Sequence, residues 1–223
     1  RIRNQPKEAG EKMKKILSTF LVLWLIWLLI AGFAVEEVIL GGVASLGFTL
    51  DPAGPTVYTR YLAEGATSEF FDTRLALLNP GETAADVTLR YLTRDGATLT
   101  QTLALPARTR ATVFPATLLG AAEFSTVVES SVPLVVDRTM AWSVATPYGA
   151  HTETAVAAPA LTWYLAEGAT HSGFNLFYLL QNPNPAEAQV RVRFLLPAGA
   201  PLAKTYTLVP HSRTDIWVDY EEF

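Results

Sequence analysis

The pattern of hydrophobic and polar positions divides the chain into two unlike parts. Residues 16–35 form a run of twenty uncharged residues, and a helix of that length reaches about 30 Å, the thickness of a bilayer core. From about residue 59 onward, short segments alternate apolar and polar residues or are rich in β-branched and aromatic side chains. The pattern predicts one N-terminal transmembrane helix followed by an all-β part of antiparallel β-sandwiches.

Charge orients the predicted helix. Residues 1–15 carry a net charge of +4 and the rest of the chain carries −8. Lys14 and Lys15 directly precede the apolar run, and Glu36 and Glu37 directly follow it. By the positive-inside rule, residues 1–15 are a cytoplasmic basic segment and the β part is extracellular. We therefore expect a single-pass protein of the cell membrane, in contact with membrane lipid.

Two alternatives for this segment stay open. Met13-Lys14-Lys15 and the small residues of Gly32-Phe33-Ala34 imitate a secretory signal with a cleavage site, although the apolar region of such signals is usually about 7–15 residues long. The other alternative is a pilin-like filament subunit, whose apolar N-terminal helix packs in a filament core. The polar leader of fifteen residues fits that alternative less well.

Several residues in 16–50, the predicted transmembrane helix and its apolar extension, are candidates for helix packing. Trp24 and Trp27 lie inside the apolar run rather than at its ends, where aromatic belts are found. Gly41 and Ser45 form a small-xxx-small pair that permits close helix contact. These residues favour docking on other protein subunits or on copies of the same chain. Residues 51–58 are rich in Pro and Gly, which end any helix and form a linker.

An internal repeat organises the β part. Residues 61–114 align with residues 164–217 at a constant offset of 103 without a gap, with 21 identities in 54 positions. We name residues 59–161 copy one and residues 162–223 copy two. Copy two is incomplete by comparison, because copy one runs on through a second half. A repeat of this length is a small domain rather than one rung of a solenoid, and we expect more protein beyond Phe223.

Short sequence motifs predict strands and turns within each copy. Segments such as ADVTLRYL, STVVES, QVRVRFLL and KTYTLV favour strands. Arg94-Asp95-Gly96 lies between two such segments and predicts a hairpin, because Gly supplies the positive φ that tight turns need. The Asn-Pro pairs, among them Asn182-Pro183, mark another turn in both copies.

These motifs together resemble a family of tandem β-sandwich repeats in uncharacterised bacterial cell-surface and secreted proteins. The resemblance covers about residues 59–223 and is carried by WYLAEGAT at 163–170, QNP at 181–183, SRT at 212–214, VES at 128–130, PLVV at 133–136 and RTM at 138–140. Copy one departs from the pattern at three positions. It has Arg60, Leu78 and Thr109 where the pattern has an aromatic residue, Gln and Ser. The resemblance implies an extracellular β-domain without known catalysis.

The charged residues shared by the two copies are candidates for a structural role. Glu64 and Glu167 precede Gly65 and Gly168 in the same AEG turn, and Arg110 and Arg213 are the shared basic residues. A carboxylate at such a turn either binds a cation or ligand, or forms a structural ion pair or caps backbone N–H groups. Its presence in both copies favours the structural role.

Composition limits the function classes. The chain has no Cys, so disulfides, thiolate nucleophiles and Cys-based metal sites are excluded. The net charge of −4 argues against a nucleic-acid partner. The three His residues lack metal-ligand spacing, and no nucleophile motif or phosphate-binding loop is present. We expect no catalytic residues, cofactor or metal.

The expected function is that of a membrane-anchored structural or adhesive protein of the cell surface, not an enzyme. Two alternatives remain: an accessory single-span subunit of a larger membrane protein complex, and the filament subunit.

Overall fold

The structure, a computed structural model, describes residues 56–142 and 149–223. The described residues all belong to one compact unit, Pro52–Phe223. The predicted membrane segment therefore lies outside the described residues, together with Trp24, Trp27, Gly41 and Ser45. Within 56–142 and 149–223, no helix has the length and apolar character needed to cross a membrane.

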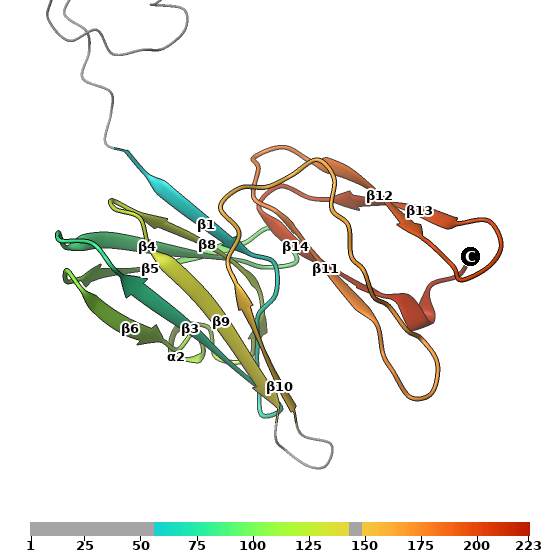
Figure 1. Cartoon of the computed structure of the whole chain (residues 1–223), viewed down its shortest axis with the longest axis horizontal. Coiled ribbons are helices and arrows are strands. Elements are labelled where there is room, and N and C mark those ends of the chain that lie inside the picture. The colour runs from blue at the N-terminus through green and yellow to red at the C-terminus, as the bar shows by residue number, and fades with distance from the viewer. Residues whose placement is uncertain (1–55, 143–148) are drawn as a thin grey trace, which may run out of the picture. The chain divides into compact units, whose positions relative to one another are not determined.

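The described part is built almost wholly from antiparallel strands, which confirms the all-β fold class (Figure 1). The elements of copy one are β1 (Tyr58–Leu62), β2 (Ala66–Thr67), β3 (Phe71–Asn79), β4 (Ala85–Leu92), β5 (Thr98–Leu105), β6 (Thr109–Val113), α2 (Ala116–Leu119), β7 (Ala122–Glu123), β8 (Ser125–Ser130), β9 (Val135–Trp142) and β10 (Gly149–Thr154). The elements of copy two are β11 (Phe177–Asn182), β12 (Ala188–Phe194), β13 (Leu202–Leu208), β14 (Ser212–Trp217) and the 3-10 turn η1 (Val218–Tyr220).

Copy one is a sandwich of two four-stranded sheets, with strand orders β1-β8-β4-β5 and β10-β9-β3-β6. Alternate residues of each strand point into the space between the sheets, so Val87, Leu89 and Tyr91 of β4 are buried. Leu75 and Leu77 of β3 contribute to the same core from the other sheet. The burial of these side chains is the main favourable term that holds the sheets face to face.

The chain crosses from one sheet to the other between β8 and β9. β8 pairs with both β1 and β4, and β9 pairs with both β3 and β10. We name residues 125–142 the β-arch, because its two strands lie in different sheets. The β-arch therefore supplies one inner strand to each sheet.

The buried Asn of the Asn-Pro pair fixes the same loop in both copies. Asn79 and Asn182 are 0% and 2% exposed. The side-chain amide of Asn79 donates to the carbonyl oxygens of Thr83, Leu105 and Pro106, at 2.8, 3.2 and 3.1 Å. The amide of Asn182 donates to the carbonyl oxygens of Ala186, Leu208 and Val209, at 2.9, 3.3 and 3.0 Å. Each amide thus ties its own loop to the strand that ends beside it.

Backbone angles repeat as well. Arg108 and His211, which are 103 positions apart, have φ of 55° and 49°. Gly96 lies in the predicted turn between β4 and β5 and has φ of 84°, and its counterpart Gly199 has φ of 91°. The repeated sequence therefore folds in the same way in both copies from β3 to β6 and from β11 to β14.

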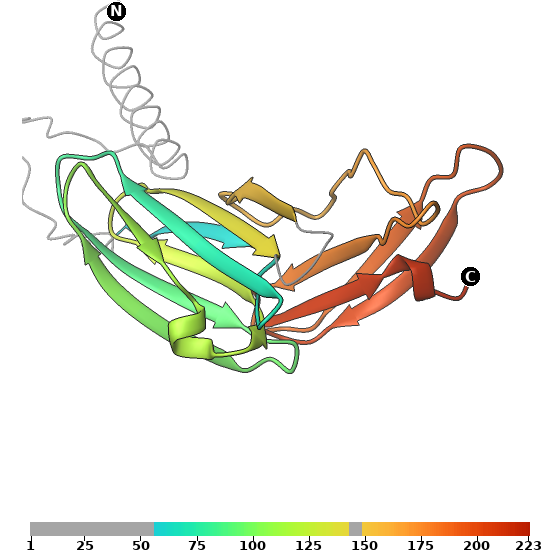
Figure 2. The same cartoon turned by 90° about the horizontal axis from the view of Figure 1, so that it is seen from below.

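The two copies differ in which strands are present. In copy two, β11 pairs only with β14 and β12 only with β13 among the described residues (Figure 2). Residues 161–165 correspond to β1 but form no strand. In copy one, β1 is held by its pairing with β8 of the β-arch, so a strand at this position depends on a long-range partner.

We expect Asn79→Ala to lower the free energy of unfolding by about 3 kcal/mol. The substitution removes the hydrogen bonds of the two amide N–H groups and the one that Oδ1 accepts from the backbone N–H of Gly81, each worth roughly 1 kcal/mol. Urea denaturation followed by circular dichroism measures the change. Asn175→Ala is the matched control, since Asn175 is exposed, and its effect should stay within about 0.5 kcal/mol. Equal effects of the two substitutions would contradict the structural role of Asn79.

Candidate functional site

Glu64 of the first AEG turn forms an ion pair with Arg138 of the β-arch. Arg138 Nη1 donates to Glu64 Oε2. The side chain of Arg138 is 1% exposed and that of Glu64 is 20% exposed. A guanidinium this deeply buried is tolerated only with a charged partner, because an unpaired buried charge costs several kcal/mol. Glu64 supplies that partner.

Two further residues from β10 face the same guanidinium. Arg138 Nη2 donates to Glu153 Oε2 at 3.1 Å and lies 3.4 Å from His151 Nδ1. His151 Nε2 is 3.5 Å from Glu64 Oε2. Arg138 therefore connects the AEG turn to β9 and β10.

Gly65 is required by close packing. A Cβ at this position would lie 2.5 Å from the Phe124 ring, and Phe124 is fully buried against Tyr91 with ring centroids 5.4 Å apart. The carbonyl oxygen of Gly65 accepts hydrogen bonds from the backbone N–H of Phe124 at 2.9 Å and from Arg213 Nη1 at 3.0 Å. The AEG turn of copy one is thus bonded both to its own core and to copy two.

The AEG turn of copy two has different surroundings. Glu167 is exposed and has no ion-pair partner within the described residues. Gly168 is packed closely, since a Cβ there would lie 2.8 Å from Leu176 Cδ2. The structure therefore pairs the carboxylate of one AEG turn and leaves that of the other exposed.

The shared arginines also differ between copies. Arg110 on β6 is exposed. Arg213 on β14 is 5% exposed, and its Nη2 lies 2.8 Å from Asp215 Oδ1. Glu123 lies 3.8 Å from Arg213 Nη1. The buried Arg213 thus joins copy two to the β2–β7 end of copy one.

The surroundings of Asp215 favour its protonated form more than water does. Burial raises the pKa of Asp215 to about 6 against the opposing attraction of Arg213, and the nearby Glu123 contributes to this rise. Asp215 is therefore ionised at pH 7.5 and largely protonated at pH 5. Arg213 is the cation that makes the ionised form tolerable.

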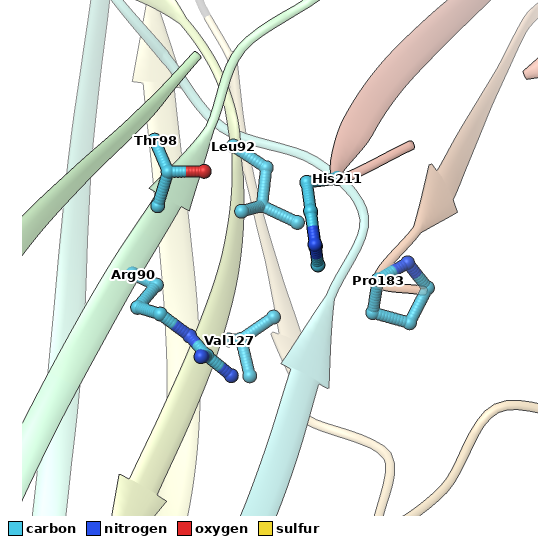
Figure 3. Close-up of a pocket in the computed structure, with 6 residues that line it drawn as sticks. All are labelled: Arg90, Leu92, Thr98, Val127, Pro183 and His211. Atoms are coloured by element: carbon cyan, nitrogen blue, oxygen red, sulfur yellow. The ribbon is translucent and has the colours of Figure 1, made fainter. Parts of the chain in front are cut away.

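A small hollow lies beside this junction. Its volume is about 120 Å³, well below the roughly 300–1,000 Å³ of small-molecule pockets. Figure 3 shows the residues around it: Arg90, Leu92, Thr98 and Val127 of copy one, and Pro183 and His211 of copy two. Pro183 of the Asn-Pro pair therefore lines this hollow.

The polar clusters are suited to holding strands together. In the described ranges, no group of three or more His, Asp or Glu side chains converges as metal ligands do. Buried Arg138 and Arg213 face carboxylates and a carbonyl oxygen. Arg138 stabilises the position of β9 beside the AEG turn of copy one, and Arg213 stabilises the contact between the two copies.

Arg138 belongs to the RTM motif of the resemblance, but it was not among the predicted site residues. Its position on β9 gives a usable signal, because it alternates with the buried Val136 and Met140. A charged residue on the inward face of an alternating strand indicates a buried ion pair. Glu123 and Asp215 gave no comparable signal, since both meet Arg213 through tertiary contacts.

No family model and no curated protein sequence matches this chain. A crystal structure of Thermotoga maritima 1070 is similar at 16% identity, with a TM-score of 0.41, over 44% of this chain and 92% of that one. The Anabaena sensory rhodopsin transducer is similar at 27% identity, with a TM-score of 0.33, over 36% of this chain and 93% of its own. At such low TM-scores the two likenesses carry no argument about this chain.

We expect Glu64→Gln to lower the free energy of unfolding by about 3–5 kcal/mol, because it leaves Arg138 buried without its main counter-charge. Glu167→Gln, the same change at the same repeat position, should alter it by less than about 0.5 kcal/mol because Glu167 is exposed. Urea denaturation measures both changes. A loss at Glu167 as large as that at Glu64 would contradict the ion-pair assignment.

We expect Arg213→Gln to lower the melting temperature at pH 7.5 by roughly 6–12 °C, as removal of one partner of a buried pair costs about 3 kcal/mol. The reason is that Asp215 and Glu123 lose the cation between them. Arg110→Gln is the matched control, because Arg110 is exposed, and its melting temperature should not change.

The destabilisation caused by Arg213→Gln should depend on pH, because the charge of Asp215 does. Lowering the pH through about 6 protonates Asp215, so the ionised carboxylate that needs Arg213 is removed. The destabilisation by Arg213→Gln should therefore be smaller at pH 5 than at pH 7.5. Calorimetric scans at the two pH values test this, and a larger destabilisation at pH 5 would be the contradicting result.

Proposed function

We propose that the chain is a membrane-anchored, non-catalytic structural or adhesive protein of the cell surface that displays tandem β-sandwich repeats. The observation that supports this best is the use of the repeated polar residues. Glu64 forms an ion pair with the buried Arg138 inside copy one, and Arg213 of copy two donates a hydrogen bond to the backbone of copy one. These charged side chains stabilise copy one and its contact with copy two, as a row of stable tandem repeats requires.

The location proposed for these units follows from the sequence. Residues 16–35 are long and apolar enough to span a bilayer, and the basic residues 1–15 precede them. The N-terminus is then cytoplasmic, membrane lipid surrounds the span, and the acidic β part is outside. Nucleic acid is not a suitable partner for a β part whose residues 59–223 carry a net charge of −5.

A second candidate is an accessory single-span subunit of a larger membrane protein complex. Trp24 and Trp27 within the apolar run, and the pair Gly41 and Ser45 after it, favour this candidate because they suit helix contacts in lipid. Under this proposal the β part is carried by the complex rather than displayed alone.

A topology experiment tests the proposal. The full chain carries different peptide tags at its two ends and is produced in a bacterium. We expect the chain to stay in the membrane pellet after an alkaline carbonate wash. Protease added to intact cells should remove the C-terminal tag and spare the N-terminal one. Deletion of residues 16–35 is the control and should abolish pelleting. A C-terminal tag protected in intact cells would overturn the proposed location.

Native mass spectrometry after detergent extraction separates the candidate functions. A single or self-associated chain supports the surface protein, and stoichiometric co-purification with other membrane subunits supports the accessory subunit. Release from cells as sheared fibres would instead indicate the filament subunit.

A further inference from the structure

The strand β5 of copy one has an open edge. It lies at one end of the sheet order β1-β8-β4-β5, where it pairs with β4 on one side and with no strand of the described residues on the other. The strand is long, from Thr98 to Leu105. Along an edge strand, every other residue directs its N–H and C=O groups away from the sheet. β5 therefore offers a row of unpaired backbone groups to another strand.

β5 lacks the charge that the comparable edge strands carry. Natural sheets protect their edges from pairing with charged residues, Pro or bulges. The other edge strands of copy one, β1, β6 and β10, contain Arg60, Arg110 and Glu153. The counterpart of β5 in copy two is β13, which contains Lys204. With the sequence TLTQTLAL, β5 has neither a charged residue nor Pro. Among these five strands, β5 alone is left without this protection.

The sequence of β5 is complementary to itself. Leu99-Thr100-Gln101-Thr102-Leu103 reads the same in both directions. When two such strands pair antiparallel with their Gln101 residues opposite each other, each Leu99 lies opposite a Leu103, and each Thr100 lies opposite a Thr102. Apolar pairs and Thr–Thr pairs across two strands are favourable. A surface patch that matches itself in this way is what a two-fold symmetric dimer requires.

The two faces of β5 suit this pairing. Its three threonines and Ala104 lie on the outer face and are exposed. Leu99 and Leu103 lie on the inner face, opposite the buried Tyr91 and Val87 of β4. Leu99 is nevertheless 37% exposed, because no strand covers it on its open side. In the paired strands, Leu103 of the other molecule would cover Leu99 and bury apolar surface.

Gln101 lies on the two-fold axis of such a pair. Its Oε1 accepts a hydrogen bond from the hydroxyl of Tyr91 at 3.0 Å. An amide oxygen accepts two hydrogen bonds and an amide nitrogen donates two. Two Gln101 amides that face each other can therefore each donate an Nε2–H to the Oε1 of the other while Tyr91 keeps its bond.

We propose that β5 pairs edge to edge with β5 of a second molecule of this chain, antiparallel and centred on Gln101. The two four-stranded sheets then join into one continuous sheet. This is strand addition, in which main-chain hydrogen bonds supply the affinity. Because one strand from each molecule makes the contact, the interface is small and the dimer is weak and reversible. The inference concerns copy one and does not depend on the cellular location proposed above.

A second molecule of this chain is the occupant that the sequence of β5 favours. In the register centred on Gln101, every position from 99 to 103 meets a residue of its own kind. An unrelated strand has no reason to match all five positions. Since β5 is already formed and paired with β4 in each molecule, the dimer forms without opening either sandwich.

Disulfide cross-linking tests the register, because the chain has no Cys of its own. In the proposed register, Thr98 lies opposite Ala104 of the other molecule, whereas the two Thr98 residues lie about 20 Å apart along the strands. Full-length chains carrying Thr98→Cys or Ala104→Cys are purified in detergent and oxidised alone or mixed. We expect at least about five times more disulfide-linked dimer from the mixture than from either variant alone, since a disulfide needs directly opposed residues. No cross-linked dimer from the mixture, or equal yields in all three samples, would overturn the proposal.

A charge placed on β5 should weaken the dimer. Thr102 is exposed, and Thr102→Lys brings two like charges to diagonally adjacent positions across the paired strands. Sedimentation equilibrium of the full chain in detergent measures the dissociation constant, which should rise at least about tenfold. Thr205→Lys is the matched control, because it makes the same change at the same repeat position on β13, and it should alter the constant by less than about twofold. A dissociation constant that Thr102→Lys leaves unchanged would overturn the proposal.

Hydrogen exchange on the unsubstituted full chain identifies the strand that pairs. Raising the chain concentration through the dissociation constant should slow exchange at residues 99–103 and leave β1, β6, β10 and β13 unchanged. Protection that appears in β13 but not in β5 would assign the dimer to copy two and overturn the proposal. Exchange in β5 that does not change with concentration would overturn it as well.

Discussion

The β-arch is the constraint on which the rest of copy one depends. It gives an inner strand to each sheet, and it carries Arg138 into the core to meet Glu64. Without β8, neither β1 nor β4 has the neighbour it has in copy one, and without β9 the edge of β3 is open. The β-arch therefore both completes the two sheets and neutralises the charge of Glu64. Without it, the edges of β4 and β3 would be unpaired and Glu64 would lose its partner, and both changes cost free energy.

The two copies differ in a way that separates features set by nearby residues from features that depend on distant strands. The turn angles at Arg108 and His211, and the Asn79 and Asn182 networks, are the same although the sheets around them differ. They need only residues within one half of the repeat. The strand at residues 58–62 has no counterpart in copy two, because it depends on pairing with a distant segment. Local sequence thus fixes the hairpins, and long-range pairing fixes the sandwich.

The same division explains how far sequence analysis could reach. The segment ADVTLRYL coincides with β4, since alternation reports directly on a half-buried strand. The turn at Gly96 was predicted because its backbone geometry requires glycine. The sequence could not reveal that Arg110 is exposed and Arg213 buried, since the two occupy one repeat position and differ only in what packs on them. Nor could it join Glu64 to Arg138, which lie in different halves of copy one.

A buried arginine also selects a register. On β9, a shift by one residue would turn Arg138 outward and bring Asp137 or Thr139 into the core. A shift by two residues would keep the arginine inside but move it away from Glu64, and a buried guanidinium without its carboxylate costs about 3–5 kcal/mol. Apolar residues such as Val136 and Met140 tolerate either position far better. The ion pair between Arg138 and Glu64 therefore adds less to the strength of the sandwich than to its uniqueness, because it penalises every pairing of β9 but one.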